Sequence, residues 1–175
     1  MAVHLEDSDH HMSNVLKDLY KSKGKLENYF DVKTPVDLWR GQKRDLIKKK
    51  RGALYPELTG FTRGDGTFRI PDVEVFERES DGVTMVRGCR CVAGDGDYRG
   101  VSTFDVMPDL GKSFMYFRIP GGTAIPEALA VTKDTFNRRF GGYHYTVAPK
   151  DDMPLSLFLV WLGAIEASLK AEGGK

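Results

Sequence analysis

Hydrophobic and polar residues alternate over several short segments of the chain, which is typical of half-buried strands. The clearest segment is residues 143–149, YHYTVAP, where two tyrosines and a valine fall on one face and His144 and Thr146 on the other. If the valine face belongs to the core, His144 points outward or into a cleft. Further strands are predicted at residues 36–41, 73–80, 83–92 and 113–120, with a hairpin tip at residues 64–66 and a turn at residues 80–82.

Three other segments are predicted to be helical. Residues 13–30 carry apolar side chains at near-helical spacing. Residues 134–140, DTFNRRF, fit a short helix capped by Asp134 and ended by a glycine. A final helix is predicted from Pro154 to about Lys170. Its first two turns are apolar nearly all round, so it should pack into the body of the protein or against a partner.

Short strands with flanking helices, without an internal repeat or a linker, predict one α+β domain. Hydrophobic residues make up 41% of the 175 residues and charged residues 29%, the balance of a folded protein with a substantial core. The formal net charge of +1 argues against a dedicated nucleic-acid coat or a membrane-surface binder. The basic run at residues 43–51 is interpreted as a solvated helix face or loop; the alternative is a surface that attracts phosphate.

Cys89 and Cys91 are separated by one residue, so on a strand they would share a face as small, half-buried side chains. They are predicted to be free thiols, which suits a reducing cytoplasm. The first residues contain acids and histidines instead of a basic region followed by an apolar run, so no signal peptide is expected. The longest apolar run, residues 153–165, is shorter than the roughly 20 residues that span a bilayer, so no membrane insertion is expected.

Several familiar catalytic motifs are missing from the sequence. It contains no GxxxxGK[ST], no GxGxxG opening a helix after a strand, no HExxH, no GxSxG and no paired CxxC. Nucleotide hydrolysis on a P-loop and hydride transfer on a Rossmann fold are therefore disfavoured, and no metal site is expected. His144 is the one histidine inside a predicted element, and its position alone favours a partly buried strand residue bonded to a backbone carbonyl.

Residues 119–155 hold a more specific pattern. It reads IPxGTxIPxxL from Ile119, then Asp134 and Asn137, then HYT at residues 144–146, followed by Pro149 and Met153. Upstream, LWRG at residues 38–41 and GVSTFD at residues 100–105 complete it. This pattern closely resembles the type VI secretion exported effector two toxins, a bacterial family with an ADP-ribosyltransferase-like fold. The resemblance covers roughly residues 36–155 and is strongest after residue 117.

The resemblance implies a split β-sandwich of short, mostly antiparallel strands with flanking helices, assigned to residues 36–175. The N-terminal segment with a helix, residues 1–35, lies outside the resemblance, and both parts are expected to form one structural domain. It implies NAD as the substrate and Arg40, Ser102 and His144 as catalytic residues. Arg40 would also bind NAD, together with Tyr55, Thr103 and Tyr145. In the arginine-serine-glutamate branch of these transferases a late strand supplies a glutamate, and the matching strand here has no glutamate.

The function implied is an antibacterial toxin that transfers ADP-ribose from NAD to an unidentified intracellular acceptor. The alternatives are an NAD glycohydrolase on the same site and a non-enzymatic binding toxin that uses the basic segment 43–51, with nucleic acid as a candidate partner. A cognate immunity protein is expected in the producing cell. The toxin would be made in the bacterial cytoplasm, exported by a secretion machine, and active in the cytoplasm of the target cell.

Overall fold

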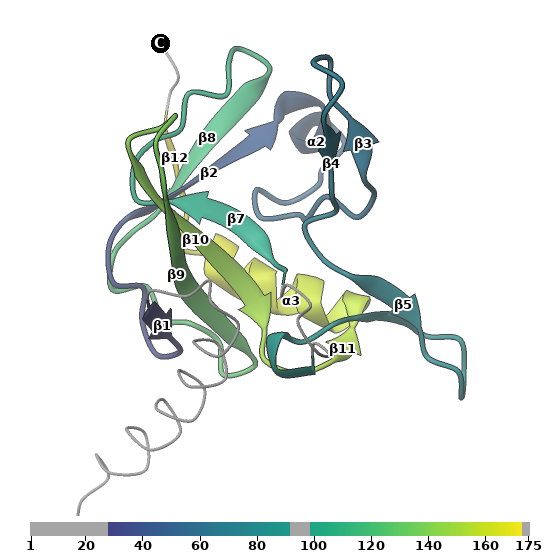
Figure 1. Cartoon of the computed structure of the whole chain (residues 1–175). Helices are drawn as coiled ribbons and strands as arrows, with labels where there is room; N and C mark the ends of the chain where they lie inside the picture. Colours follow the sequence, from purple (N-terminus) through teal and green to yellow (C-terminus); the bar gives the residue numbers. More distant parts are fainter. Residues whose placement is uncertain (1–27, 92–98, 173–175) are drawn as a thin grey trace, which may run out of the picture.

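The computed structural model describes residues 28–91 and 99–172. Its largest element is an antiparallel sheet of seven strands in the order β1-β9-β10-β7-β2-β8-β12 (Figure 1). In chain order these strands are β1 (Asn28–Phe30), β2 (Leu38–Lys43), β7 (Val101–Phe104), β8 (Phe114–Ile119), β9 (Leu129–Asn137), β10 (Gly142–Pro149) and β12 (Lys170–Glu172).

Two smaller sheets and two helices complete the described fold. One sheet has the order β11-β6-β5, and the other is the hairpin β3–β4. The elements are β3 (Phe61–Thr62), β4 (Phe68–Arg69), β5 (Val75–Glu77), β6 (Thr84–Val86), β11 (Met153–Pro154), α2 (Arg44–Lys48), α3 (Leu155–Glu166) and the 3₁₀ turn η1 (Cys89–Cys91). The fold class is therefore α+β, as the sequence predicts.

The core lies between helix α3 and the large sheet. Phe158, Leu162 and Ile165 of α3 are buried, at the spacing that places side chains on one helix face. They belong to the same apolar cluster as fully buried residues of the sheet, which include Leu38, Val101, Leu129, Val131 and Val147. Val160 on the same helix is 65% exposed, so α3 covers the sheet with one face and shows an apolar side chain on another. In the part of the chain that the structure describes, no helix has the length and apolar character needed to cross a membrane.

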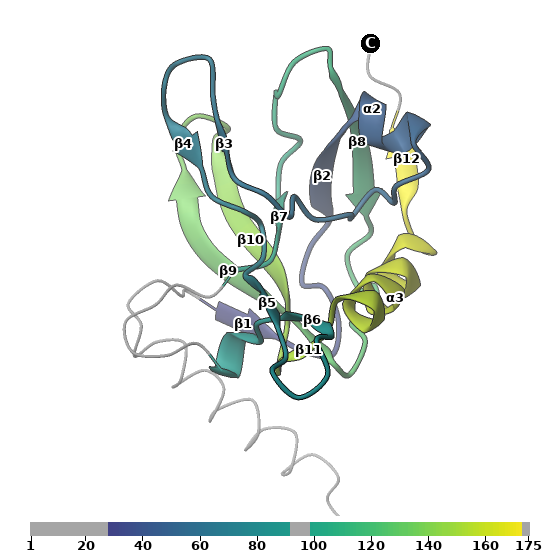
Figure 2. The same ribbon diagram turned by 90° about the vertical axis from the view of Figure 1, so that its right-hand side faces the viewer.

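The large sheet is divided beside strand β7. The ladder between β2 and β7 consists of the single pair Trp39↔Phe104, whereas β2 pairs with β8 over six positions. Figure 2 shows the β9–β10 part and the β2–β8 part diverging on the two sides of β7. Beyond the Trp39 pair, a side chain connects the two strands in place of a backbone pair: Nη1 of Arg40 on β2 donates a hydrogen bond to the carbonyl of Ser102 on β7 at 3.1 Å. The reduced pairing between β2 and β7 therefore divides the sheet, and the candidate functional site described below involves residues of β7 and β10.

Two helix predictions need correction. Residues 134–140 do not form a helix: residues up to Asn137 continue strand β9, and the remainder form the turn into β10. The pairing of β9 with β10 satisfies the backbone there, so it overrides a local helical pattern. The helix predicted at residues 13–30 is wrong for its last three residues, which form β1 at Asn28–Phe30; residues 13–27 lie outside the described ranges. The final helix ends at Glu166, and Lys170 begins β12.

The two cysteines lie in the turn η1 instead of on a strand. Just before this turn, Gly88 packs so closely against the backbone of Asp151 that a Cβ would collide. Cys89 is buried and Cys91 exposed, so they do not share a face, although both are free thiols as predicted. Burial raises the pKa of the Cys89 thiol to about 12, which makes it a weak nucleophile.

Candidate functional site

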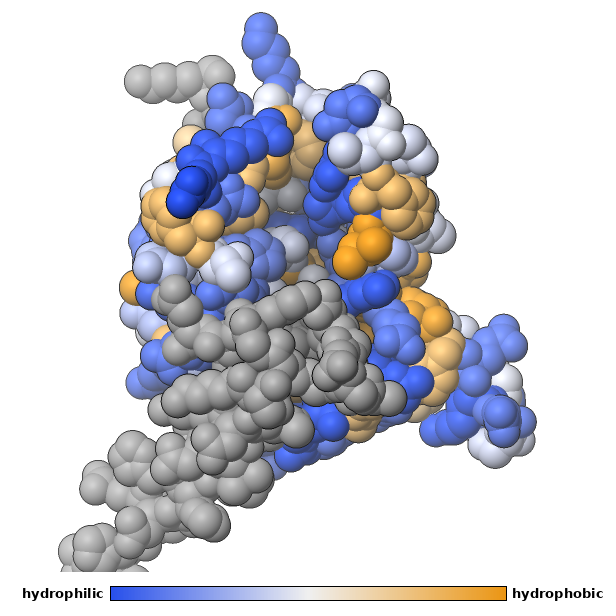
Figure 3. Space-filling model, viewed as in Figure 1, coloured by the Kyte–Doolittle hydropathy of each residue, from blue (hydrophilic) through white to orange (hydrophobic). Residues whose placement is uncertain are grey.

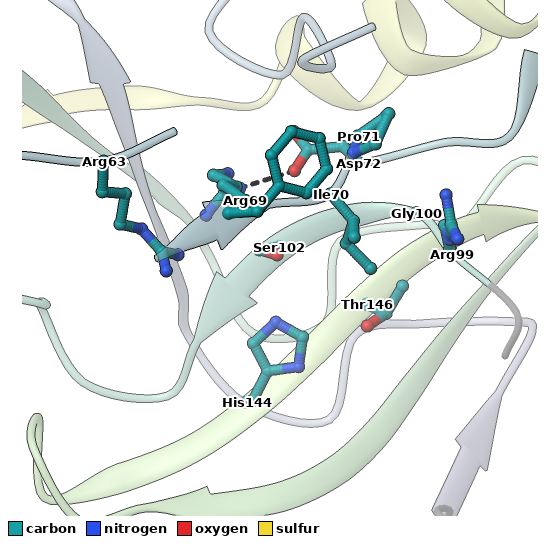
Figure 4. A pocket seen from close by; sticks show the side chains of 11 residues that line it. Arg63, Arg69, Ile70, Pro71, Asp72, Arg99, Gly100, Ser102, His144 and Thr146 are labelled. Carbon is teal, nitrogen blue, oxygen red and sulfur yellow. Dashed lines mark hydrogen bonds and ion pairs between the residues drawn. The ribbon is translucent and has the colours of Figure 1, made fainter. Parts of the chain in front are cut away.

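Segments that are distant in the sequence line one cavity of about 270 Å³ (Figure 4). The hairpin β3–β4 and the residues after it, up to Asp72, supply one wall. Ser102 on β7 and the two residues before that strand supply the second wall, and His144 and Thr146 on β10 supply the third. Of the three predicted catalytic residues, Ser102 and His144 meet here, while Arg40 does not line the cavity.

The register of β7 and β10 explains why Ser102, His144 and Thr146 share the cavity. The two strands pair antiparallel with Thr146 opposite Ser102, so both side chains stand on the same face. His144 is two residues along β10 and therefore also lies on that face. The chain before β7 approaches β10 closely at Gly100, where a Cβ would collide with the carbonyl of Val147. Glycine is required there for the cavity wall to close against β10.

His144 is held by a carboxylate. Its Nδ1 lies 2.7 Å from Oδ2 of Asp134 on β9, and that same oxygen accepts a hydrogen bond from Oγ1 of Thr146 at 2.6 Å. Oδ1 of Asp134 accepts from Oγ1 of Thr132 at 2.7 Å. The imidazole also packs edge-to-face on Phe104, with ring centroids 5.2 Å apart. The imidazole ring is thus held by a hydrogen bond at Nδ1 and by its packing against the ring of Phe104.

A β-bulge brings Asp134 to His144. The register between β9 and β10 runs Phe136↔Tyr143 and then Lys133↔Tyr145, so two residues of β9 oppose the single residue His144. Bulges of this kind redirect side chains and are frequent beside active sites. Beside this bulge, the carboxylate of Asp134 is hydrogen-bonded to Thr132, His144 and Thr146.

Arg40 lies behind the cavity in a buried ion network. Its side chain is 8% exposed, and Nη2 lies 3.3 Å from Oδ2 of Asp72, which is 3% exposed. The other oxygen of Asp72 binds Arg69 at 2.6 Å. Burial lowers the pKa of the Arg40 guanidinium, and the charge of Asp72 acts in the opposite direction. This network ties the hairpin β3–β4 to the large sheet.

The predicted NAD-binding residues Tyr55, Thr103 and Tyr145 do not line the cavity. Thr103 is fully buried with its hydroxyl donating to the carbonyl of Tyr145, and Tyr145 is 3% exposed in the core. Both alternate with the cavity residues along their strands, so they face the opposite side of the sheet. The guanidinium carbon of Arg51 lies 4.6 Å above the centre of the Tyr55 ring. These three side chains therefore lie outside this cavity, and their contact with NAD stays a prediction.

Three arginines that the sequence analysis did not select surround the cavity: Arg63, Arg69 and Arg99. Nη1 of Arg63 donates to Oγ1 of Thr67, and Arg69 is paired with Asp72. The Nε atom of Arg99 is buried without a hydrogen-bond partner among the described residues. A buried donor of this kind carries an energetic cost that an acceptor in the cavity would remove.

Phe68 and Ile70 add apolar surface to the same wall. They line the cavity and are 62% and 50% exposed. Figure 3 shows apolar and hydrophilic surface side by side on this face of the molecule. An exposed aromatic ring beside cationic side chains suits a ligand that combines a flat ring with phosphate groups.

Asp134 is the other residue whose role the sequence analysis missed. The local sequence predicts Asp134 as a helix cap, and its position ten residues before His144 shows no periodicity that would pair the two side chains. The available signal was the joint presence of Asp134 and the HYT segment in the family pattern. For the arginines, the hairpin tip at residues 64–66 was the signal, because it predicts that Arg63 and Arg69 flank one loop.

Fold and cavity together define an α+β protein in which a divided antiparallel sheet holds a histidine, a serine and several arginines around one pocket. A family model described as the Tse2 ADP-ribosyltransferase toxin matches residues 17–169, so this chain belongs to the Tse2 ADP-ribosyltransferase toxin family. The resemblance seen in the sequence is thereby confirmed.

Among curated proteins, Toxin Tse2 of Pseudomonas aeruginosa strain PAO1 is 40% identical to this chain over 57 residues. The match spans 33% of this chain and 36% of that protein.

Proposed function

We propose that this chain is an antibacterial toxin that transfers ADP-ribose from NAD to a macromolecular acceptor inside the target cell. The observation that carries the proposal is the convergence of His144, Ser102 and cationic side chains on one cavity, in a chain of this family. On this proposal NAD is the substrate. The toxin leaves the producing cell through a type VI secretion machine, and a cognate immunity protein protects the producer by covering the cavity.

The chemistry of the reaction agrees with this arrangement. Cleavage of the bond between nicotinamide and ribose builds positive charge on the ribose carbon, while the diphosphate of NAD stays negative throughout. Arg63 and Arg99 suit the diphosphate, because a guanidinium binds phosphate oxygens through a planar fork of donors. Ser102 and His144 then face the ribose, and Phe68 offers a surface on which a ring stacks.

Arg40 has a supporting role in this proposal. Its contacts with the Ser102 carbonyl, the Tyr55 carbonyl and Asp72 hold β7 and the hairpin wall at a fixed separation. To bind phosphate directly, the Arg40 side chain, which is 8% exposed, would have to leave its buried ion pair with Asp72. Such a loss is costly for a buried ion pair.

Nicotinamide release by the purified full-length chain tests the proposal. We expect release from NAD, transfer of a label on the adenosine half to an acceptor in a bacterial extract, and loss of both in His144→Ala. Release without transfer would indicate an NAD glycohydrolase, which the solvent-accessible position of His144 also allows. No release at any protein concentration would count against both enzymes.

A matched pair of aromatic variants locates the site of the reaction. Phe68 and Phe136 are 62% and 51% exposed, but Phe68 lines the cavity, whereas Phe136 packs on Tyr143 at the end of β9. We expect Phe68→Ala to raise the KM for NAD and Phe136→Ala to leave it unchanged. Equal effects of the two variants would place NAD elsewhere.

A further inference from the structure

The carboxylate of Asp134 determines which nitrogen of His144 carries a proton. A carboxylate oxygen can only accept hydrogen bonds, so at 2.7 Å from Asp134 the Nδ1 atom of His144 is the donor. The threonine hydroxyls at 132 and 146 donate to the same carboxylate, whose side chain is 12% exposed. With the proton on Nδ1, the neutral imidazole presents a lone pair at Nε2.

The lone pair at Nε2 is directed into the cavity. In Figure 4 one ring nitrogen of His144 lies on the Thr146 side, and the other is turned toward Ser102 and Arg69. Within residues 28–91 and 99–172, the hydrogen bond to Asp134 is the one that His144 makes, so Nε2 is available to a ligand. Contact with Phe104 keeps the ring from turning.

Among the residues that the structure describes, one acidic side chain lines this cavity. Asp72 is the one carboxylate among the described residues that line it, and both its oxygens are occupied by Arg40 and Arg69. Its carboxylate is therefore held in place by two ion pairs and is not free to turn toward a substrate. Among the described residues that line the cavity, the imidazole of His144 is the best-placed base.

We propose that Asp134 is a positioning residue that holds His144 with Nε2 as the base for the acceptor in ADP-ribose transfer. The inference rests on the proposed function. The bond between the ribose C1′ and the nicotinamide nitrogen breaks, and its electron pair leaves with nicotinamide. An acceptor hydroxyl or water forms the new C1′–O bond, and its proton passes to Nε2. The resulting imidazolium is stabilised by Asp134, so a histidine–aspartate pair takes the place of the late-strand glutamate.

The proton position in the wild-type chain is the first test. Two-bond ¹H–¹⁵N correlation spectra of the full-length protein with ¹⁵N-labelled histidine distinguish protonated from unprotonated ring nitrogens, with His144→Ala providing the assignment. We expect His144 to carry its proton on Nδ1 in the neutral state. A proton on Nε2 would overturn the proposal, and this measurement needs no variant of Asp134.

The variant Asp134→Asn is the second test, because its amide can donate to Nδ1 and so move the imidazole proton to Nε2. We expect the spectra to change accordingly, and kcat for nicotinamide release to fall roughly 10²–10⁴-fold with KM for NAD within about 3-fold of wild type. A kcat within about 3-fold of wild type would overturn the proposal.

Asp105→Asn is the matched control. Asp105 also braces β10, accepting a hydrogen bond from the backbone of Tyr143 at 2.7 Å, whereas the side-chain hydrogen bond of His144 goes to Asp134. Asparagine can accept the same bond, so we expect wild-type spectra and kcat. An equal loss of kcat in Asp105→Asn would show that bracing β10 alone matters, and would overturn the specific role of Asp134. If the wild-type chain released no nicotinamide, the proposed function and the proton-transfer step would both fall, while the spectra would still decide the positioning of His144.

Discussion

The two faces of strands β7 and β10 differ sharply although their residues alternate one by one. On the core face, Val101, Thr103, Tyr145 and Val147 are at most 3% exposed. On the cavity face, Ser102, His144 and Thr146 line a solvent-accessible pocket. A shift of register by one residue would exchange the two sets. Strand pairing therefore fixes which side chains face the cavity, and the core face enforces this pairing.

The largest expected difference is between the neighbours Tyr145 and His144. Tyr145→Ala removes a buried aromatic ring and should lower the free energy of unfolding by about 3–5 kcal/mol, with NAD turnover following the folded fraction. His144→Ala should reduce turnover roughly 10²–10⁴-fold while the free energy of unfolding changes by about 1 kcal/mol. Chemical denaturation and nicotinamide release measure both. If His144→Ala instead unfolds the protein, and toxicity merely follows protein abundance, the histidine is structural.

The two faces of β10 could be predicted from the sequence, because residues 143–149 alternate and place His144 opposite the valine face. Burial itself does not alternate, since residues 145–149 are all buried in the structure. Ser102 could be found only through the family pattern, since one serine in a short strand has no distinguishing periodicity. Both residues lie at the cavity because their strands pair directly.

The rest of the site depends on contacts that a single sequence does not encode locally. Asp134 reaches His144 through a bulge, and one extra residue in β9 leaves no mark on the hydrophobic pattern. The family resemblance implies that Arg40 binds NAD, but in the structure its side chain lies at the split in the sheet, buried beside the distant Asp72. Tertiary pairing likewise converted the predicted helix at residues 134–140 into strand and turn.

The ion network between the two parts of the sheet gives the second prediction. Asp72→Ala should lower the free energy of unfolding by about 3 kcal/mol, because Arg40 would stay buried without its carboxylate. The cost falls at the low end for a buried pair, since Arg69 is 33% exposed and can turn toward water. Chemical denaturation measures the change. As a control, Asp81→Ala breaks an ion pair with Arg78 in which both side chains are 43% exposed, and it should shift the unfolding transition far less than Asp72→Ala does.

A smaller effect is expected from the cations at the cavity. Arg99→Ala should raise the KM for NAD about 10-fold, which corresponds to the loss of one charge-assisted hydrogen bond. Arg78→Ala removes the same charge from a surface outside the cavity and should leave KM unchanged. The KM of the wild type should also rise with salt more steeply than that of Arg99→Ala. Equal KM values for the two variants would remove Arg99 from the substrate site.

The smallest effect concerns Glu166, an ionisable group that binds the segment before hairpin β3–β4 to helix α3. Its Oε1 accepts a hydrogen bond from the backbone N–H of Leu54 at 2.7 Å, and burial raises the pKa of its carboxyl group. A raised pKa means that the folded state binds the proton more tightly than the unfolded state, so this group stabilises the fold most at low pH and loses that contribution as pH rises. Glu166→Gln keeps an acceptor for Leu54 and cannot ionise. Thermal midpoints measured between about pH 4 and pH 7 should therefore shift in favour of the variant as pH increases. A difference between the two proteins that stays constant with pH would mean that Glu166 ionises as freely in the folded chain as in the unfolded one.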